Sequence, residues 1–236
     1  MVTKEMDLGV LNSTDSKWGY FGMEAYKDLS KGQGFPMRLV LTGICNDISI
    51  GVPGNSPVKR LADLKGKTIA AGFARTPAVQ LQTTSALANA GLTWDDVKLL
   101  PVASPGDSAK AVMEGRADAA GSMTIGMPDL TDFNAKTGGT LLTFDPSPEA
   151  KARALKVYPD GTLNLVKGGI WPAVPKDSWL LRYEIYVVAR RDFPEDAAYQ
   201  IIKAMWDFNN ELPPIHLKFA EWTPETFASK VLTTPY

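Results

Sequence analysis

Two adjacent side chains, Arg75 and Thr76, have the types and the position expected of an anion site. They lie in a short link between a predicted buried strand at 68–71 and a predicted helix at 78–90. The first N–H groups of a helix have no partners within the helix and carry partial positive charge, so such a turn attracts small acids. A guanidinium can bind a carboxylate through two hydrogen bonds, and a hydroxyl adds another donor. We therefore predict that this turn binds a small acidic molecule.

Two further predicted strands, 8–11 and 117–122, lead into polar residues. Each strand follows an acidic residue in a tight turn, so the two passages resemble a short internal repeat. In open α/β sheets ligands bind beyond the carboxyl ends of strands, so two such ends, one per lobe, would face each other across a cleft. The predicted ligand contacts from these two passages are Asn12, Ser13, Thr124 and Gly126.

These positions also have purely structural interpretations. Thr76, Asn12 and Ser13 each precede a predicted helix, where hydroxyl and amide side chains cap the first N–H groups. For Asn12 and Ser13 we favour capping as the main energetic role, while both roles remain open for Thr76. Gly126 can equally serve only the turn before the proline at position 128.

Aromatic residues offer a wall for the apolar part of a ligand. Trp171 lies in a glycine-flanked loop, where it either covers the ligand or packs into the core of its own lobe. Tyr183 and Tyr186 lie on a predicted strand at 180–189. Because their separation is odd, they point to opposite faces, so only one of them should face the cleft. We include Tyr183 among the predicted ligand contacts and leave the choice between the two tyrosines open.

Strands alternate with helices along most of the chain, which predicts an α/β fold with mainly parallel sheets flanked by helices. Loop residues near 53 and an extended segment near 181 predict two crossings between lobes, and two extended crossings make a hinge. The first lobe is then predicted to contain 1–53 and 181–236, and the second lobe 54–180. The predicted helices are 14–27, 78–90, 106–114, 128–136, 147–157 and 194–211, and the predicted strands include separate ones at 37–42 and 47–52.

Composition excludes several classes of function. A net charge of −1 gives no electrostatic case for nucleic acid or an anionic membrane surface, and no apolar run reaches the length of a membrane span. Cys45 is the single cysteine and His216 the single histidine, with no protease or nucleophile-elbow signature around either. There is no histidine or cysteine cluster for a metal and no glycine-rich nucleotide motif. We therefore expect no catalytic residues, no metal and no cofactor.

Four segments in this order resemble a known family: DLKGK at 63–67, AGLTWDDVK at 90–98, EGRADAAGSM at 114–123, and YEIYVVARRDFPEDAAYQII at 183–202. The chain resembles the TAXI-class solute receptors of tripartite ATP-independent periplasmic (TRAP) transporters. The resemblance implies the type II periplasmic-binding-protein fold, hinge closure on a small carboxylate or amino-acid-like solute, permease subunits as partners and a periplasmic location. The turn at 74–77 departs from the Gly/Ser-rich turn of that family, so the identity of the solute stays open.

The resemblance also implies that the chain is a fragment. Receptors of this class have a signal peptide, a strand and a helix ahead of the strand at 8–11, and a further helix after Tyr236. We therefore expect an incomplete first lobe that leaves an apolar sheet edge exposed or swapped with a partner. The oligomeric state is open.

Two other functions remain as alternatives. An effector-sensing domain of a regulator can share this fold, and an upstream DNA-reading helix-turn-helix would favour it. An enzyme of the pyrimidine-precursor type has a related fold, and it would need a catalytic histidine or cysteine cluster.

Overall fold

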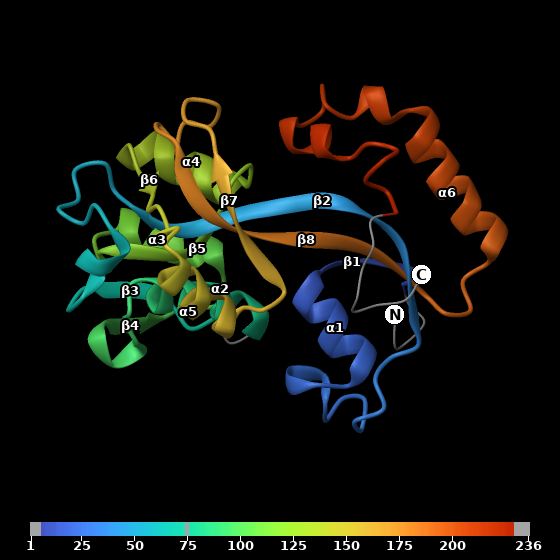
Figure 1. The fold of residues 1–236 in the computed structure, drawn as a ribbon, viewed down its shortest axis with the longest axis horizontal. Helices are drawn as coiled ribbons and strands as arrows, with labels where there is room; N and C mark the ends of the chain where they lie inside the picture. Colours follow the sequence, from blue (N-terminus) through green and yellow to red (C-terminus); the bar gives the residue numbers. More distant parts are fainter. Residues whose placement is uncertain (1–5, 74–75, 229–236) are drawn as a thin grey trace. The chain divides into compact units, whose positions relative to one another are not determined.

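The chain folds into two compact units, which the computed structural model describes over residues 6–73 and 76–228 (Figure 1). The first unit comprises Met1–Cys45 and Tyr183–Tyr236, and the second unit comprises Asn46–Arg182. The second unit is therefore an insertion in the first, and the chain passes between them twice.

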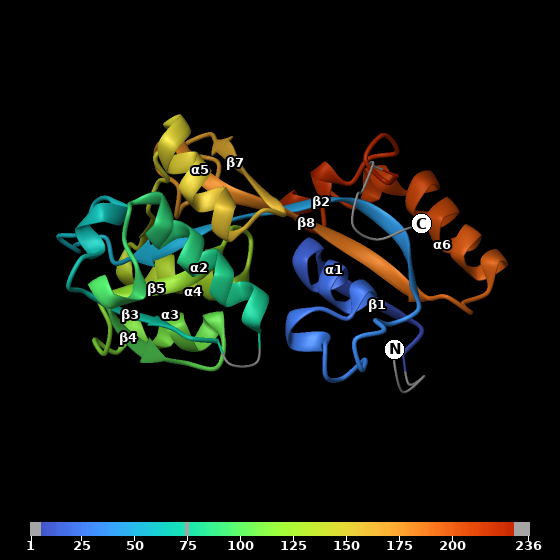
Figure 2. The same cartoon turned by 60° about the horizontal axis from the view of Figure 1, so that its bottom comes forward.

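The second unit is built on three parallel strands. Strand β3 (Thr68–Ala71) lies between β4 (Lys98–Pro101) and β5 (Ala119–Thr124), and β5 is antiparallel to β2 (Met37–Val52). Parallel neighbours need a crossover, which α2 and α3 supply. The helices of this unit, visible in Figure 2, are α2 (Pro77–Asn89), α3 (Pro105–Met113), α4 (Pro128–Thr137) and α5 (Pro148–Val157). Short strands β6 (Thr140–Leu141) and β7 (Gly161–Val166) pair with β2 and β8 (Ser178–Arg190).

Small residues on β5 allow helices to approach the sheet closely. Gly121 has no room for a side chain, because an added Cβ would lie 2.9 Å from the Thr83 Oγ1 atom of α2. On α3, the Ser108 hydroxyl donates to the Ala70 carbonyl at 2.6 Å and accepts from the Gly121 N–H at 2.9 Å. The ladder between β3 and β5 pairs Ile69 with Ala119 and Ala70 with Ala120. The Ser108 hydroxyl therefore bridges the two strands directly after the last of these pairs.

The first unit has the strand order β1-β8-β2, with β1 (Leu8–Asn12) antiparallel to β8. Two apolar clusters form on these strands. One contains Met37, Leu39, Tyr186 and Val188, and the other contains Val40, Leu41, Ala189 and Phe227. The helices of this unit are α1 (Ser13–Phe21) and α6 (Glu195–Asp207). Single turns of 3₁₀-helix in the two units are η1 (Glu24–Tyr26), η2 (Leu61–Leu64), η3 (Trp94–Asp96), η4 (Asn209–Glu211) and η5 (Leu217–Glu221).

Two predicted boundaries were wrong for reasons that concern single glycines. Helix α1 ends at Phe21 rather than continuing to 27, because Gly22 adopts a left-handed φ of 65° and its N–H bonds to the Trp18 carbonyl. The predicted strands 37–42 and 47–52 are one continuous strand, β2, in which Gly43 has a φ of 101°. A Cβ at Gly43 would lie 2.5 Å from Thr226 Oγ1, so the close approach of a distant segment explains the glycine.

Replacement of Gly43 by alanine should therefore destabilise the first unit. Gly32→Ala is the matched control, since Gly32 has a φ of 73° with no atom within 4 Å of an added Cβ. We expect the control to cost about 1–2 kcal/mol from the left-handed backbone alone. Gly43→Ala should cost at least about 1 kcal/mol more, because the methyl group also pushes against Thr226. Chemical denaturation of both variants measures the difference, and equal losses would contradict the packing argument.

Candidate functional site

Helix α2 begins beyond the carboxyl end of β3, at Thr76 and Pro77. Thr76 is the N-cap residue by its backbone, and its carbonyl accepts hydrogen bonds from the N–H groups of Val79 at 2.9 Å and Gln80 at 3.3 Å. Its hydroxyl makes no capping bond, and the buried Oγ1 atom has no partner among the described residues. The side-chain capping interpretation of Thr76 was therefore wrong, and a buried donor is left over at a helix start. Arg75 lies outside the described residues.

Helix α2 differs at its start from the two helices that follow the other parallel strands. Helix α3 is capped by Ser104, whose hydroxyl accepts from the Asp107 N–H at 3.2 Å, and it carries the Asp107 carboxylate in its first turn. Helix α4 carries Asp129 in its first turn. Helix α2 has no side-chain cap and no acidic residue in its first turn. Because a carboxylate opposes anion binding at a helix start, α2 has the most favourable electrostatics of the three.

Behind the start of α2 lies a buried polar network that the sequence analysis did not include. The Ser122 hydroxyl donates to Gln82 Oε1 at 2.8 Å, and Gln82 Nε2 donates to the Tyr158 hydroxyl at 3.4 Å. Ser122 has a φ of 53°, which is uncommon for a residue with a side chain. No local sequence signal indicates it, since the conformation depends on Gln82 of another element.

Gly126 and Trp171 lie together in the second unit. With Leu130, Asn134 and others they line a small cavity of about 60 Å³. Gly126 has a φ of 82° in the turn after Thr124, so its turn role is confirmed, while Trp171 packs partly buried against the core of the unit. Thr124 is buried at the end of β5. A cavity of this size holds about two water molecules, so it is too small for a solute by itself.

Helix α1 begins with a closed network of its own. Asn12 Oδ1 accepts from the Asp15 N–H at 2.7 Å, and Asn12 Nδ2 donates to Asp15 Oδ2 at 2.6 Å, which confirms the capping role of Asn12. The Tyr26 hydroxyl donates to Asp15 Oδ1 at 3.3 Å. Burial raises the pKa of Asp15, although the bonds from Asn12 and Tyr26 act in the opposite direction. Ser13 is 3% exposed, and its Oγ atom has no partner among the described residues.

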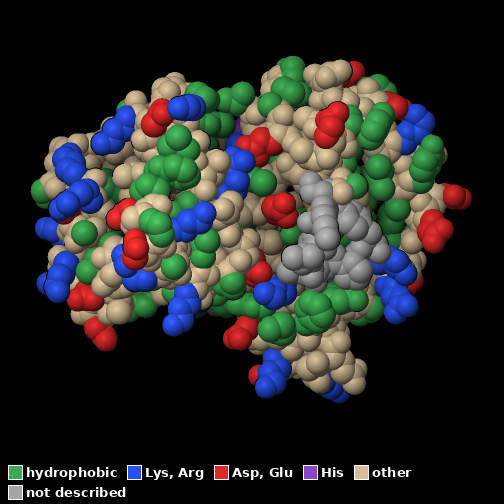
Figure 3. All heavy atoms as spheres, in the orientation of Figure 1, with side chains coloured by type: hydrophobic (Ala, Val, Ile, Leu, Met, Phe, Trp, Pro, Cys, Tyr) green, Lys and Arg blue, Asp and Glu red, His purple; other side chains and the backbone are tan. Residues whose placement is uncertain are grey.

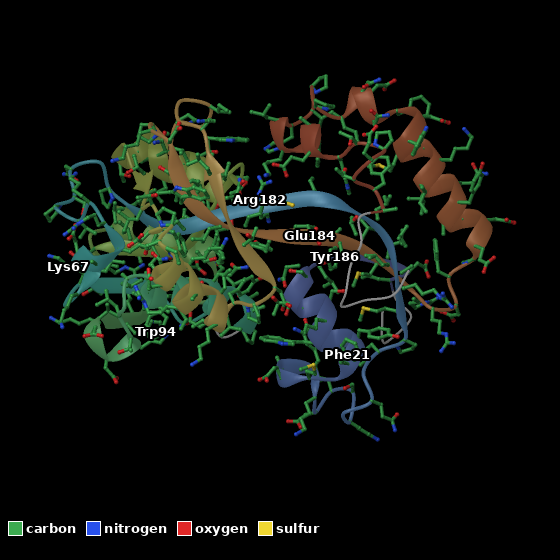
Figure 4. The ribbon with its side chains drawn as sticks, viewed as in Figure 1. Phe21, Lys67, Trp94, Arg182, Glu184 and Tyr186 are labelled. Atoms are coloured by element: carbon green, nitrogen blue, oxygen red, sulfur yellow. The ribbon has the colours of Figure 1, made fainter. Side chains whose placement is uncertain are left out.

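Strand β8 carries both tyrosines and also Arg182, which forms an ion pair that was not predicted from the sequence. Figure 4 labels Arg182, Glu184 and Tyr186 on this strand. Tyr186 is buried in the first unit and its hydroxyl donates to Glu184 Oε2 at 2.7 Å, and Tyr183 is also buried. In the second unit, Arg182 donates to both carboxylate oxygens of buried Asp47, at 2.8 and 2.7 Å. Asn164 Nδ2 donates to Asp47 Oδ1 at 3.0 Å. The group ties β2, β7 and β8 together. The sequence signal for this ion pair was a single acidic residue, Asp47, next to the apolar residues of β2.

The described residues give little support for metal binding or for a catalytic pair of cysteine and histidine. They contain no cluster of three or more histidine, cysteine or acidic side chains that could hold a metal. His216 caps η5, where its Nδ1 accepts from the Lys218 N–H at 3.2 Å, and the Cys45 N–H donates to Glu221 at 3.0 Å. Basic and acidic side chains are both scattered over the visible surface (Figure 3). Within the described ranges, none of the helices combines the length and the apolar content needed to cross a membrane.

Solved structures with similar folds are periplasmic binding proteins. The periplasmic aliphatic sulphonate binding protein SsuA from Escherichia coli is 18% identical with a TM-score of 0.51, over 93% of this chain and 56% of that one. The alkanesulfonate-binding protein SsuA from Xanthomonas axonopodis pv. citri, bound to MOPS, is 17% identical with a TM-score of 0.50, over 93% and 60%. The periplasmic sulfonate-binding protein SsuA from Methylobacillus flagellatus KT is 20% identical with a TM-score of 0.50, over 90% and 54%.

The fold is thus the α/β fold of two-lobed periplasmic binding proteins, and these neighbours are binding proteins rather than enzymes. The chain spans less than two thirds of the length of each of them. The chain belongs to the NMT1-like family, whose sequence pattern matches residues 1–236.

The network at the start of α1 predicts a loss of stability at high pH. Burial, with a further contribution from the Asp15 carboxylate, raises the pKa of Tyr26 to about 12. An unfolded tyrosine titrates near pH 10, so between about pH 10 and about pH 12 the unfolded state loses its proton first and stability falls. The loss should not exceed roughly 2 kcal/mol, because the ring is half-buried and solvent screens the charge.

Tyr26→Phe tests this expectation, because phenylalanine has no proton to lose. Denaturant unfolding at about pH 8 and about pH 11 should show a smaller decrease in stability for the variant than for the parent. The same decrease in both proteins would place the pH dependence elsewhere.

Proposed function

We propose that this chain captures a small organic anion as an extracytoplasmic solute-binding protein and delivers it to a membrane permease. The observation that carries the proposal is the start of α2, where a buried Thr76 hydroxyl that has no partner among the described residues follows the carboxyl end of a parallel strand. Native proteins pair nearly all buried polar groups, and unpaired ones often mark a site that a ligand completes.

The described groups at this position favour an anion. Pro77 has no N–H, so Ala78 supplies the first backbone donor within the helix, beside the Thr76 hydroxyl. The helix dipole adds positive potential, and no carboxylate lies in the first turn to oppose it. We propose a carboxylate or amino-acid-like solute, and Ser13 remains a proposed contact. Asn12, Arg75, Thr124, Gly126, Trp171 and Tyr183 remain proposed contacts.

Two transporter classes are candidates for the partner. The four sequence segments that resemble TAXI-class receptors support permease subunits of a TRAP transporter. The similarity to sulfonate-binding SsuA proteins, one of which belongs to a putative sulfonate ABC transporter, supports an ABC transporter and a sulfonate solute instead, as the second candidate. Both candidates imply a periplasmic location, small-molecule capture and closure of two lobes on the solute. Both also share the anion site, so a ligand screen separates them by the preferred head group.

The two remaining alternatives, an enzyme and a regulator's sensing domain, would each require different features of the protein. An enzyme of the pyrimidine-precursor type would need a catalytic histidine or cysteine cluster, and the contacts known for the described His216 and Cys45 are with Lys218 and with Glu221. A regulator's sensing domain would bind its effector through the same site. It would, however, be attached to a DNA-binding element rather than work with a permease.

A thermal-shift screen should identify the class of solute. A ligand that binds only the folded state raises stability by about 2.7 kcal/mol at 100 times its dissociation constant. Carboxylates, amino acids, sulfonates and neutral sugars should be compared in Tris buffer, since MOPS is itself a sulfonate. We expect shifts with anions. Shifts confined to neutral sugars would contradict the proposal, and a preference for sulfonates over carboxylates would favour the second candidate.

Thr76→Val should separate binding from folding. The hydroxyl has no partner in the described structure, so the variant should fold with nearly unchanged stability. Affinity for the anion identified by the screen should fall by about 1–3 kcal/mol, because a hydrogen bond to a charged group is lost.

Thr83→Val is the matched control for Thr76→Val. Thr83 is 1% exposed on the same helix, and its Oγ1 also has no partner in the described part of the chain, but it packs over Gly121 rather than at the helix start. Calorimetric titration should find parental affinity for Thr83→Val. Equal affinities for the two variants and the parent would show that the Thr76 hydroxyl does not contact the solute.

A further inference from the structure

The side chain of Gln80, on α2, connects this helix to the end of strand β3. Its Oε1 atom accepts a hydrogen bond from the Gly72 N–H at 2.8 Å, and Gly72 has a left-handed φ of 86° directly after the strand. The Gln80 N–H donates to the Thr76 carbonyl at 3.3 Å. Helical side chains lean toward the N-terminus of their helix, so the Gln80 amide lies beside the first turn of α2. The candidate anion site is therefore next to this amide.

The bond to Gly72 fixes the orientation of the Gln80 amide. A backbone N–H can only donate, so the atom that faces Gly72 must be Oε1. The Nε2 group, which can only donate, then occupies the other corner of the amide. The link between β3 and α2 is thus closed by a neutral side chain.

Carboxylates accept backbone N–H groups at other loops and turns of the second unit. They include Asp63, Asp96, Asp118, Asp145 and Asp177, with distances between 2.8 and 3.0 Å. The backbone N–H groups of Ser147 and Gly168 lower the pKa of Asp145 and of Asp177, respectively. Such a bond therefore favours the charged form of the acceptor, as hydrogen bonds to a carboxylate generally do.

Helix α2 differs from this pattern at its start. Among the α-helices in the described ranges, it alone has no acidic residue in its first turn. Glutamate has the length of glutamine and could accept from the Gly72 N–H with a full charge, and a helix start favours acidic side chains. Folding alone would therefore favour glutamate at position 80, and the neutral amide needs another explanation.

We infer that Gln80 is a specificity-determining residue, which closes the link between β3 and α2 while it keeps negative charge away from the anion site. The inference rests on the proposed function and deepens it, because it assigns part of the preference for anions to one side chain. A carboxylate at position 80 would keep the bond to Gly72 but would repel an anion bound at the Thr76 hydroxyl and the Ala78 N–H.

Gln80→Glu tests the inference with three small probes and the full ¹⁵N-labelled chain. Acetate and methanesulfonate are the head groups of the two candidate solute classes, and acetamide has the shape of acetate without its charge. Each probe should be titrated at one ionic strength, with the Ala78 amide followed by NMR. We expect the affinity for both anions to fall at least about tenfold, and the response to acetamide to change by less than about twofold.

Gln200→Glu is the matched control, because it makes the same change in net charge at an exposed position of α6 in the first unit. We expect this variant to bind both anions as the parent does, since solvent and salt screen an exposed charge. Chemical denaturation supplies a second readout. Gln80→Glu should be at least as stable as the parent, because its carboxylate keeps the bond to Gly72 and favours the helix start.

The outcomes separate this inference from the proposed function. Equal anion affinities in Gln80→Glu and the parent would overturn the inference while the anion site itself stands. An equal loss of affinity in Gln200→Glu would also overturn it, and so would a loss of stability in Gln80→Glu, which would show that folding requires the amide. If neither anion shifts the Ala78 amide of the parent, the proposed function fails and the inference fails with it.

Discussion

The position of the candidate anion site depends on how closely two helices approach strand β5. Gly121 admits Thr83 of α2 on one side, and the Ser108 hydroxyl of α3 bridges β5 to β3 by bonds of 2.6 and 2.9 Å. A larger residue at 121 would push α2 away from the sheet. Because α2 then could not begin where it does, the Thr76 hydroxyl would no longer lie at the edge formed by the carboxyl ends of β3 and β5. The close packing of α2 and α3 on β5 therefore positions the candidate anion site of the second unit.

Buried polar groups extend this constraint through the second unit. Gln82 links Ser122 to Tyr158, and Asp47 receives bonds from Arg182 and Asn164. Such networks fix the directions of strands because leaving one member unpaired costs the desolvation energy of a buried group. The Asp47 group lies where β2 and β8 leave the second unit, so it fixes the geometry of both connecting strands on that side. Among the described residues of this unit, Thr76 Oγ1 and Thr83 Oγ1 are the buried side-chain polar atoms that have no hydrogen-bond partner.

Local patterns predicted most elements of the second unit, although they missed β7. Helix α2 was predicted at 78–90 and is Pro77–Asn89, and β3 was predicted at its observed bounds. The patterns failed where distant residues decide the outcome. Separate strands were predicted at 37–42 and 47–52, because nothing nearby in sequence indicates that Thr226 packs against Gly43 within a single strand. Similarly, Asp47 and Arg182 are 135 positions apart, and a single sequence gives no sign that they meet.

The candidate site was predicted in part for the same reason. Spacing placed Thr76 at the helix start, but only the structure shows that its hydroxyl is buried without a described partner. For Asn12 the capping role follows from its position before a helix, and its bonds to Asp15 confirm it. The sequence did not indicate the left-handed backbone of Ser122, because contacts with another element hold it.

The central claim is that an organic anion binds at the start of α2. Titration of the ¹⁵N-labelled chain with the anion that gives the largest thermal shift tests it most directly, with amide shifts followed by NMR. The account predicts that the largest changes occur at Ala78 and the N–H groups beside it in the first turn. Saturable binding that leaves the Ala78 amide unmoved, with the largest changes elsewhere in the chain, would contradict it.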